Sequence, residues 1–368
     1  MCVGAEAFLS AARDAVAGCR QRLLVQFSTF EGDASGEALA ELLLEAAARG
    51  VDVRLSLDHY SDVVLNDVIP LLVHRRAEVN AERRRTRALL DRLTRGGVQL
   101  RRTAPVGRFG CYLLYRDHKK LVLADDVAFV GGINVSDHNF GWHDFMVRIT
   151  GDVVADLARD FLTTWDGATV TLDQPAAAGD FVLNQAAGRP TVLQEIIRMI
   201  DGAQRSVLIE SPYLLGDVIE AALRRAARRG AEVTVVIPWR ANHTWARIWA
   251  RSLLRHLDHP NVECFGYRGA HDMTHAKVLV VDARRATFGS FNMLELEGLT
   301  QKELNVFSDD HDLVDQLEGL VRADVSASDR MPVPRSSFGR FTYTWLYAFF
   351  RWWTRRLLRR PEWRQRYC

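Results

Sequence analysis

The feature that most constrains the fold of this chain is a short polar pattern that occurs twice. Each copy has a histidine, a lysine two positions later and an aspartate seven positions after the histidine. The residues are His118, Lys120 and Asp125 in the first copy, and His275, Lys277 and Asp282 in the second. A pattern repeated this closely predicts an internally duplicated chain whose two halves fold alike.

Both copies continue into a glycine and then an asparagine. The first runs through Gly131 and Gly132 to Asn134, and the second reaches Asn292 by way of Ser290. On a strand, alternate side chains face the same way, so the histidine and lysine of each copy project into one space. Two imidazoles can divide between them the attack on a phosphodiester and the protonation of the leaving alcohol.

The segments around the motifs alternate between strand and helix patterns. In the first half we expect a strand at 24–27, a helix at 38–48 and a strand at 51–55. The second half repeats this order with a strand at 207–209, a helix at 218–227 and a strand at 233–237. Such alternation predicts the α/β class, with a sheet covered by helices on both faces in each half.

Composition changes along the chain divide it into repeats, a linker and a tail. The stretch 166–190 is rich in alanine and glycine and contains prolines, as connections between packed units do. We expect a first repeat at 1–170 with a basic insertion near 64–102, a linker at 171–190, a second repeat at 191–330 and a tail at 331–368.

The overall composition fits a globular protein in a reducing compartment. Hydrophobic residues make up 48% of the 368 residues, enough for a buried core, and the five cysteines are scattered and odd in number. The first residues lack the basic and apolar regions of a signal peptide, and no stretch has the roughly 18 apolar residues of a membrane span. We therefore expect neither a signal peptide nor a transmembrane span.

The motifs resemble those of the phospholipase D superfamily. Its signature is histidine, any residue, lysine, four residues, aspartate, six residues, glycine-serine, one residue and asparagine, and the copy beginning at His275 matches it throughout. The copy at His118 has five residues between Asp125 and Gly131, and Gly132 in place of serine. Within the superfamily the chain most resembles bacterial cardiolipin synthases, which share Gly-Gly-Ile-Asn at 131–134 and Trp-x-Asp at 142–144.

The resemblance implies a fold and a division of labour. It implies two pseudo-twofold-related repeats, each a mixed sheet flanked by helices, with the active site at their interface. His118 would attack phosphorus and His275 would protonate the leaving group, although the reverse assignment stays open. No metal or other cofactor is implied, because lysines supply the positive charge.

The same resemblance assigns the remaining site residues. The catalytic set would be His118, Lys120, Asp125, His275, Lys277 and Asp282. Asn134, Ser290 and Asn292 would bind the substrate phosphate, while Asp144 and Glu303 would orient the histidines. The implied reaction is a phosphatidyl transfer that makes cardiolipin from phosphatidylglycerol through a phosphohistidine.

The tail favours a lipid substrate over nucleic acid. Residues 340–368 contain eight arginines against one glutamate, and six aromatic residues lie between positions 343 and 352. Aromatic rings beside arginines are typical of segments that lie at a membrane interface. A C-terminal helix packed on the body is the other interpretation of this segment, and the basic stretch 75–102 would suit either lipid or DNA phosphates, or simply be a solvated helix face.

We therefore expect an enzyme that acts on an anionic phospholipid such as phosphatidylglycerol and binds the membrane surface through its tail. Its expected location is the cytoplasmic face of the bacterial inner membrane, as a peripheral protein. The alternatives are a hydrolase of the phospholipase D type and a nucleic-acid phosphodiesterase of the same superfamily. The sequence gives no indication of an oligomeric state.

Overall fold

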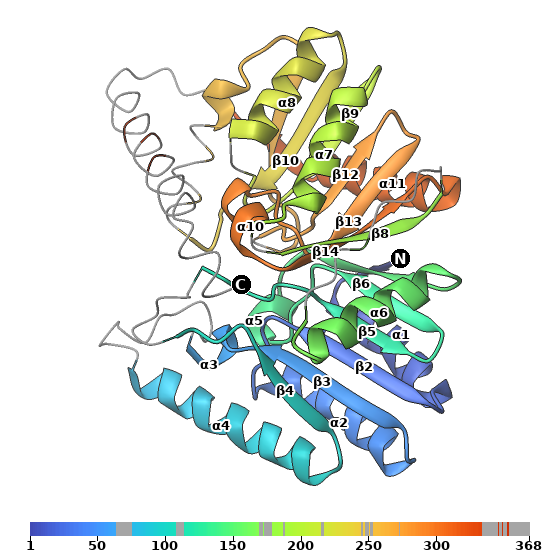
Figure 1. Ribbon diagram of the computed structural model, residues 1–368. Coiled ribbons are helices and arrows are strands. Elements are labelled where there is room, and N and C mark those ends of the chain that lie inside the picture. Colours follow the sequence, from blue (N-terminus) through green and yellow to red (C-terminus); the bar gives the residue numbers. More distant parts are fainter. Residues whose placement is uncertain are drawn as a thin grey trace. The chain divides into compact units, whose positions relative to one another are not determined.

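The fold was analysed in a computed structural model of the chain. The described residues are 1–63, 76–107, 114–168, 172, 179–186, 188–214, 217–243, 246, 250, 253–271, 273–332, 345, 348 and 352. Their helices and strands build two sheets, each of which follows one of the two repeats along the chain (Figure 1).

The first half of the chain alternates between strands and helices. Its elements are β1 (Cys2–Val3), α1 (Ala5–Gly18), β2 (Arg22–Phe27), α2 (Ala34–Ala48), β3 (Asp52–Asp58), α3 (Tyr60–Val63), α4 (Arg76–Arg95), β4 (Gln99–Thr103), β5 (Leu121–Ala124), β6 (Val127–Gly131), α5 (Asp137–Phe140), β7 (Phe145–Ile149) and α6 (Val153–Trp165).

The first sheet contains seven described strands in the order β1-β7-β6-β5-β2-β3-β4. The pairs β2–β3 and β3–β4 are parallel, whereas β2–β5, β5–β6, β6–β7 and β7–β1 are antiparallel. The sheet is therefore mixed, as the family resemblance implied. Phe8, Leu39 and Leu93 from α1, α2 and α4 share one apolar core with Val25 of β2, while α6 packs against β2 and β6.

The second half repeats this plan. Its elements are β8 (Phe181–Gln185), α7 (Thr191–Gly202), β9 (Ser206–Glu210), α8 (Asp217–Arg228), β10 (Glu232–Pro238), β11 (Val262–Tyr267), β12 (Val278–Val281), β13 (Arg285–Gly289), α10 (Glu295–Thr300), β14 (Glu303–Ser308), α11 (His311–Ser326) and β15 (Ser328–Arg330).

The second sheet contains eight described strands in the order β15-β11-β10-β9-β12-β13-β14-β8. Strands β9, β10 and β11 run parallel, and β12 is antiparallel to β9. Helices α7 and α8 pack against each other, and α11 packs along β9 to β12 (Figure 1). Both repeats thus form mixed sheets flanked by helices.

Contacts within the chain group its residues into two compact units whose limits differ from the expected repeats. The first unit comprises Met1–Asn184 together with Phe288–Ser290 and Gln301–Val306. The second unit comprises Gln185–Thr287, Phe291–Thr300 and Phe307–Cys368. Two short segments of the second repeat therefore belong to the first unit, and one of them carries Glu303.

The expected linker and the expected basic insertion both contain regular structure. Residues 171–190 were expected to be a connection, but five of them form β8, which is the edge strand of the second sheet. The insertion near 64–102 contains α4 and part of β4. A short apolar run such as Phe181–Gln185 is easily missed when it follows an alanine- and glycine-rich stretch, because it is too short to show a periodicity.

Candidate active site

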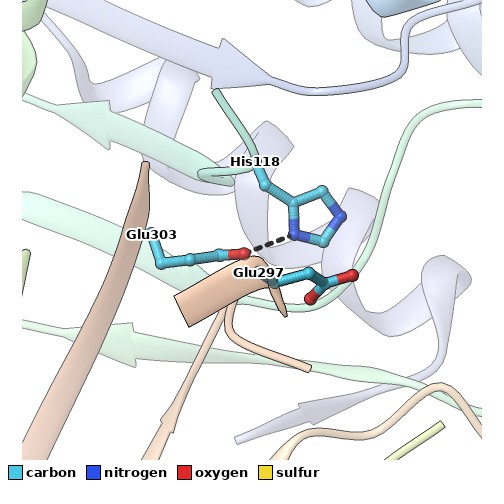
Figure 2. Close-up of side chains that lie close together, drawn as sticks. All are labelled: His118, Glu297 and Glu303. Carbon is cyan, nitrogen blue, oxygen red and sulfur yellow. Dashed lines mark hydrogen bonds and ion pairs between the residues drawn. The ribbon is translucent and has the colours of Figure 1, made fainter. Parts of the chain in front are cut away.

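The first motif lies immediately before β5, and its histidine faces a carboxylate from a distant part of the chain. The Nδ1 atom of His118 lies 3.0 Å from Oε1 of Glu303, and Figure 2 shows the imidazole next to this carboxylate. Because a carboxylate can only accept a hydrogen bond, this contact places the ring proton on Nδ1. In the neutral imidazole, Nε2 is then the nitrogen that carries the lone pair. Glu303, which the resemblance assigns as a histidine-orienting residue, thus contacts His118.

A backbone bridge fixes the distance between these two side chains. The N–H of His118 donates to the C=O of Lys302 at 2.9 Å, and the N–H of Lys302 donates to the C=O of Arg116 at 2.8 Å. Glu303 follows Lys302 directly, so its side chain leaves the chain at a fixed point beside His118. Backbone hydrogen bonds are more rigid than contacts between long side chains. The two bonds to Lys302 therefore keep the backbone of His118 and that of Glu303 at a fixed distance from each other.

Ser290 supports Glu303 instead of facing outward. Its hydroxyl donates to the second carboxylate oxygen, Oε2 of Glu303, and accepts the N–H of Leu304 at 2.9 Å. Ser290, which was expected to bind the substrate phosphate, thus contacts Glu303 through its hydroxyl.

Lys120 and Asn134, the other polar residues of the first motif, are joined through a serine that the sequence analysis did not single out. The Nζ atom of Lys120 donates to Oγ of Ser28 at 3.0 Å and to the C=O of His118 at 2.6 Å. The hydroxyl of Ser28 in turn donates to Oδ1 of Asn134 at 2.7 Å. Ser28 follows β2 directly, and a polar residue at the end of a buried strand beside the motif strand was the available signal.

The second motif occupies the same place in the second sheet, immediately before β12. His275 and Lys277 are buried, and Nζ of Lys277 lies 2.9 Å from Nδ1 of His275. The ring of Tyr213 meets the ring of His275 edge-on, with centroids 6.3 Å apart. Asn292 donates from Nδ2 to Oε1 of Glu297 at 3.1 Å. Lys277 and Tyr213 therefore both lie next to His275.

The two motif aspartates lie at the far end of their strands from the histidines. Each is in a left-handed turn, with φ of 52° at Asp125 and 57° at Asp282. Asp125 accepts three backbone N–H groups, from Arg20, Gln21 and Arg22, at 2.7 to 3.0 Å. Asp282 does the same with the N–H groups of Gln204, Arg205 and Ser206, at 2.7 to 2.9 Å for the shorter bond to each.

These contacts show where the two aspartates lie. The resemblance grouped Asp125 and Asp282 with the catalytic residues. Their carboxylates bind the backbone at the start of β2 and of β9 and at the two residues before each strand. Burial alone would raise the pKa of both carboxyl groups. The hydrogen bonds from the backbone N–H groups together have the larger effect in the opposite direction, so each pKa lies below its ordinary value.

The unequal spacing of the two motifs lies in a hairpin turn. Strands β6 and β13 each have five residues. Two residues, Asp125 and Asp126, connect β5 to β6, whereas residues 282–284 connect β12 to β13. The missing residue of the first copy therefore shortens the turn and leaves the strand unchanged.

The glycine that replaces serine in the first copy has a steric reason. A Cβ atom on Gly132 would lie 2.5 Å from both carboxylate oxygens of Asp144. Asp144 is buried and accepts the N–H of Phe145 at 2.8 Å. The first copy thus combines a glycine with a close aspartate, whereas the second combines Ser290 with the longer Glu303.

One further acidic cluster lies in the first unit, away from the motif residues. The carboxylates of Glu31, Asp33 and Glu82 each have an oxygen within 4.8 Å of the others. Asp33 caps α2 by accepting the N–H of Gly36, and Glu82 pairs with Arg85. Burial raises the pKa of Asp33. These carboxylates are therefore engaged in the fold around the start of α2.

Several arginines of the basic stretch 75–102 are paired within the fold. Arg92 of α4 lies 3.0 Å from Glu41 and also contacts Glu37 of α2. Arg102 lies 2.5 Å from Asp62. This part of the basic insertion is therefore occupied in packing α4 and β4 onto the first unit.

The tail falls almost entirely outside the described residues. Trp345 and Trp352 are described, and both are exposed, at 65% and 54%. Among the residues that the structure describes, no helix combines the length and the apolar character required to cross a membrane.

Comparison with known proteins identifies the relatives of this chain. Residues 13–165 and 196–324 match the family model for the cardiolipin synthase, phospholipase D-like domain. Cardiolipin synthase A of Pseudomonas aeruginosa is 31% identical, over 89% of this chain and 66% of the relative. The probable cardiolipin synthase of Bacillus subtilis is 26% identical, over 83% of this chain and 62% of the relative. The chain therefore spans about two thirds of the length of these relatives.

Solved structures support the same fold. Phosphatidylserine synthase of Haemophilus influenzae has a TM-score of 0.67 at 14% identity, covering 90% of this chain and 86% of that one. Polyphosphate kinase of Porphyromonas gingivalis has a TM-score of 0.57 at 13% identity, covering 95% of this chain and 51% of that one. The duplicated mixed sheets, the two motifs and the matched family model together show that this chain belongs to the cardiolipin synthase, phospholipase D-like domain family.

Proposed function

We propose that this protein transfers a phosphatidyl group from one phosphatidylglycerol to the hydroxyl of another, which forms cardiolipin and releases glycerol. The observation that carries the proposal is the contact between Nδ1 of His118 and Glu303. An imidazole held in this way by a carboxylate presents a basic Nε2, which is the form needed to attack phosphorus. The similarity to cardiolipin synthases supports the choice of lipid.

In the first step, Nε2 of His118 forms a bond to phosphorus while the bond from phosphorus to the glycerol oxygen breaks. His275 gives a proton to that oxygen, and glycerol leaves. The product of this step is a phosphatidyl-histidine on His118. Glu303 stabilises the imidazolium that develops on His118 as the new bond forms.

In the second step, the hydroxyl of another phosphatidylglycerol attacks the same phosphorus. His275 now accepts the proton of that hydroxyl, and the bond from His118 to phosphorus breaks. The number of phosphodiester bonds is unchanged over the cycle, so the exchange needs no input of energy from a nucleotide. Both histidines return to their starting protonation states.

The lysines and asparagines of the motifs supply positive charge and hydrogen-bond donors for the phosphoryl oxygens. Lys120 is buried and held by Ser28, and Lys277 is buried beside His275. A positioned donor of this kind contributes roughly 3–4 kcal/mol to transition-state stabilisation. We assign Asn134 and Asn292 to the same task, while Asp125 and Asp282 act through the fold.

We also propose that the tail 331–368 attaches the protein to an anionic membrane surface, at the cytoplasmic face of the bacterial inner membrane. Its arginines and aromatic residues support this, and the exposed Trp345 and Trp352 have the character of interfacial anchors. Deletion of 340–368 should weaken binding to phosphatidylglycerol vesicles in a sedimentation assay. Unchanged sedimentation of the truncated protein would contradict the anchor.

The reaction is tested by incubating the purified protein with phosphatidylglycerol vesicles in the presence of a chelator and analysing the lipids. Cardiolipin and free glycerol in equal amounts support the transfer. Phosphatidic acid without cardiolipin would make the protein a hydrolase of the phospholipase D type. Cleavage of DNA in the absence of any lipid product would establish the nucleic-acid phosphodiesterase instead.

A further inference from the structure

The two motifs differ beneath their histidines, in residues that the signature does not include. The register of the sheets shows which positions of the two repeats correspond. Gln26 of β2 pairs with Leu121 of β5, and Glu210 of β9 pairs with Val278 of β12. Leu121 lies three residues after His118, and Val278 lies three residues after His275. Gln26 therefore corresponds to Glu210. A residue a given number of positions before His118 likewise corresponds to the residue the same number of positions before His275.

The residue directly before each histidine makes the same buried contact in both repeats. In the first, Nε2 of Gln26 donates to Oδ1 of Asp117 at 2.9 Å. In the second, Oγ1 of Thr274 donates to Oε1 of Glu210 at 2.5 Å. In the first repeat the acid precedes the histidine and the donor lies on β2, whereas in the second repeat the acid lies on β9 and the donor precedes the histidine. Each motif therefore has one buried carboxylate beside it. This contact is thus common to both halves.

The first repeat has a second buried contact near its histidine, and the corresponding positions of the second repeat do not have it. Asp58 ends β3, and its Oδ1 accepts Nη1 of Arg116 at 2.7 Å, with both side chains buried. The register pairs Gln26 with Ser56 and Glu210 with Val236, so Asp58 corresponds to Pro238 and Arg116 to Met273. Both counterparts are buried and apolar. The fold therefore accepts an apolar pair at the place where the first repeat has an ion pair.

The ion pair is not explained by stability. Burial raises the pKa of Asp58 to about 7, even though Arg116 and the backbone N–H groups of Tyr60 and Asp117 lower it. Desolvation thus outweighs the favourable contacts at this carboxylate. Buried ion pairs can commonly be replaced by packed apolar residues without loss of stability, and the corresponding positions of the second repeat hold two buried apolar residues, Pro238 and Met273.

The contacts of Asp58 do explain how His118 is positioned. Asp58 accepts the N–H of Asp117, the residue next to His118. The C=O of Arg116 and the N–H of His118 are bound on the other side to Lys302. Residues 116–118 are therefore fixed to β3 on one side and to the segment carrying Glu303 on the other.

We propose that Asp58 and Arg116 are positioning residues for His118, which hold the tripeptide 116–118 in register with Lys302 and Glu303 and have no counterpart in the second motif. The inference rests on the proposed function, in which His118 is the nucleophile. A nucleophile must meet phosphorus in line, and a displacement of about 1 Å can reduce the rate about 100-fold. The ion pair gives this rigidity to one motif and distinguishes it from the other.

The test uses two variants and a matched control. Asp58→Asn keeps the shape and one acceptor oxygen but removes the charge. The double variant Asp58→Leu/Arg116→Met introduces an apolar pair like that of the second repeat. The control is Asp52→Asn, which removes a similar carboxylate from the other end of β3, where Asp52 lies 2.9 Å from Arg54 near the surface.

Each protein is assayed with bis(4-nitrophenyl) phosphate and with phosphatidylglycerol vesicles at pH 8, above the pKa of about 7 at which Asp58 ionises, and its melting temperature is recorded. We expect both Asp58 variants to lose about 10- to 100-fold in kcat with KM within about twofold, because alignment and not binding is disturbed. The control should match the wild type. A purely structural role would lower the melting temperature and the active fraction, so kcat is referred to the concentration of active sites, counted from the first-turnover burst of 4-nitrophenolate.

A kcat within about threefold of the wild type in either folded variant would overturn the inference. A loss confined to KM would do the same. The soluble diester separates this inference from the proposed function: a wild type that hydrolyses it but makes no cardiolipin contradicts the lipid reaction alone. A wild type inactive on both substrates would contradict both.

Discussion

Glu303 reaches His118 across 185 positions of sequence, and its Oε1 lies 3.0 Å from Nδ1 of the imidazole. The two residues come from opposite repeats of the duplicated chain. The acid that follows the second motif therefore contacts the histidine of the first. Lys302 makes this possible, because its backbone binds both Arg116 and His118.

Replacing Glu303 with glutamine should lower kcat by roughly 100-fold or more, because the amide cannot stabilise the imidazolium and no longer fixes the tautomer of His118. Lipid turnover measured at saturating vesicle concentration checks this. Glu232→Gln, an exposed change at the start of β10, is the control. Full activity of Glu303→Gln would show that His118 is oriented in another way.

Asp125→Ala should destabilise the protein by about 2–4 kcal/mol, because three backbone N–H groups lose a charged acceptor. Denaturant unfolding measures the change. The neighbouring Asp126 is exposed, and Asp126→Ala should stay within about 0.5 kcal/mol of the wild type. If Asp125→Ala folded as stably as the control but lacked activity, the carboxylate would be catalytic after all.

Gly132→Ser restores the signature of the family, yet we expect it to be harmful. The added Cβ would meet the oxygens of Asp144 at 2.5 Å, and crowding of this kind costs about 1–3 kcal/mol. The melting temperature and kcat should both fall. Gly18→Ala, where nothing lies within 4 Å of the added carbon, is the control. An unchanged Gly132→Ser protein would mean that Asp144 is not confined at this point.

The raised pKa of Asp58 predicts a pH dependence of stability. The folded protein keeps the Asp58 proton up to its pKa of about 7, whereas the unfolded chain releases it near the ordinary aspartate pKa of 3.8. Raising the pH between these values therefore lowers the stability contributed by this group. Among the charged neighbours, Arg116 lowers the pKa of Asp58 and Asp117 raises it, but burial is the largest contribution.

The melting temperature of the wild type relative to Asp58→Asn should accordingly fall from pH 5 to pH 7 and level off above pH 7. Calorimetry across this range measures the difference. Aspartates whose pKa is lowered on folding, such as Asp125, lose their contribution to stability only when the pH falls below the ordinary pKa of 3.8. They therefore do not affect the stability between pH 5 and pH 7. A constant difference between the two proteins would show that Asp58 is ionised throughout.

Much of the fold could be predicted because the information was local. The period of the apolar residues marked the strands and helices, and the spacing of His275, Lys277 and Asp282 carried the family resemblance. The sequence did not predict that Gln301–Val306, a segment of the second repeat, packs with the first unit, because no local pattern shows this. Strand β8 was missed for a related reason, because its place at the edge of the second sheet depends on a distant partner.

The roles of individual site residues were harder to predict than their identity. Asp125 and Ser290 both belong to the signature, but one binds the start of β2 and the other binds Glu303. Asp58 and Arg116 lie outside the signature and are 58 positions apart, so they come together only because β5 and β3 both pair with β2. Contacts of this range depend on tertiary packing, which the order of residues does not display.

The central claim is that His118 forms a covalent bond to the phosphorus of the lipid. Wild-type protein mixed with phosphatidylglycerol for less than one turnover, quenched in base and digested, can be analysed by mass spectrometry for a phosphatidyl-histidine. The account predicts the adduct on His118, its absence in His118→Ala, and its accumulation in His275→Ala when a substrate with an activated leaving group is used. An adduct on His275 in the wild type would reverse the two roles, and lipid exchange without any adduct would contradict the covalent mechanism.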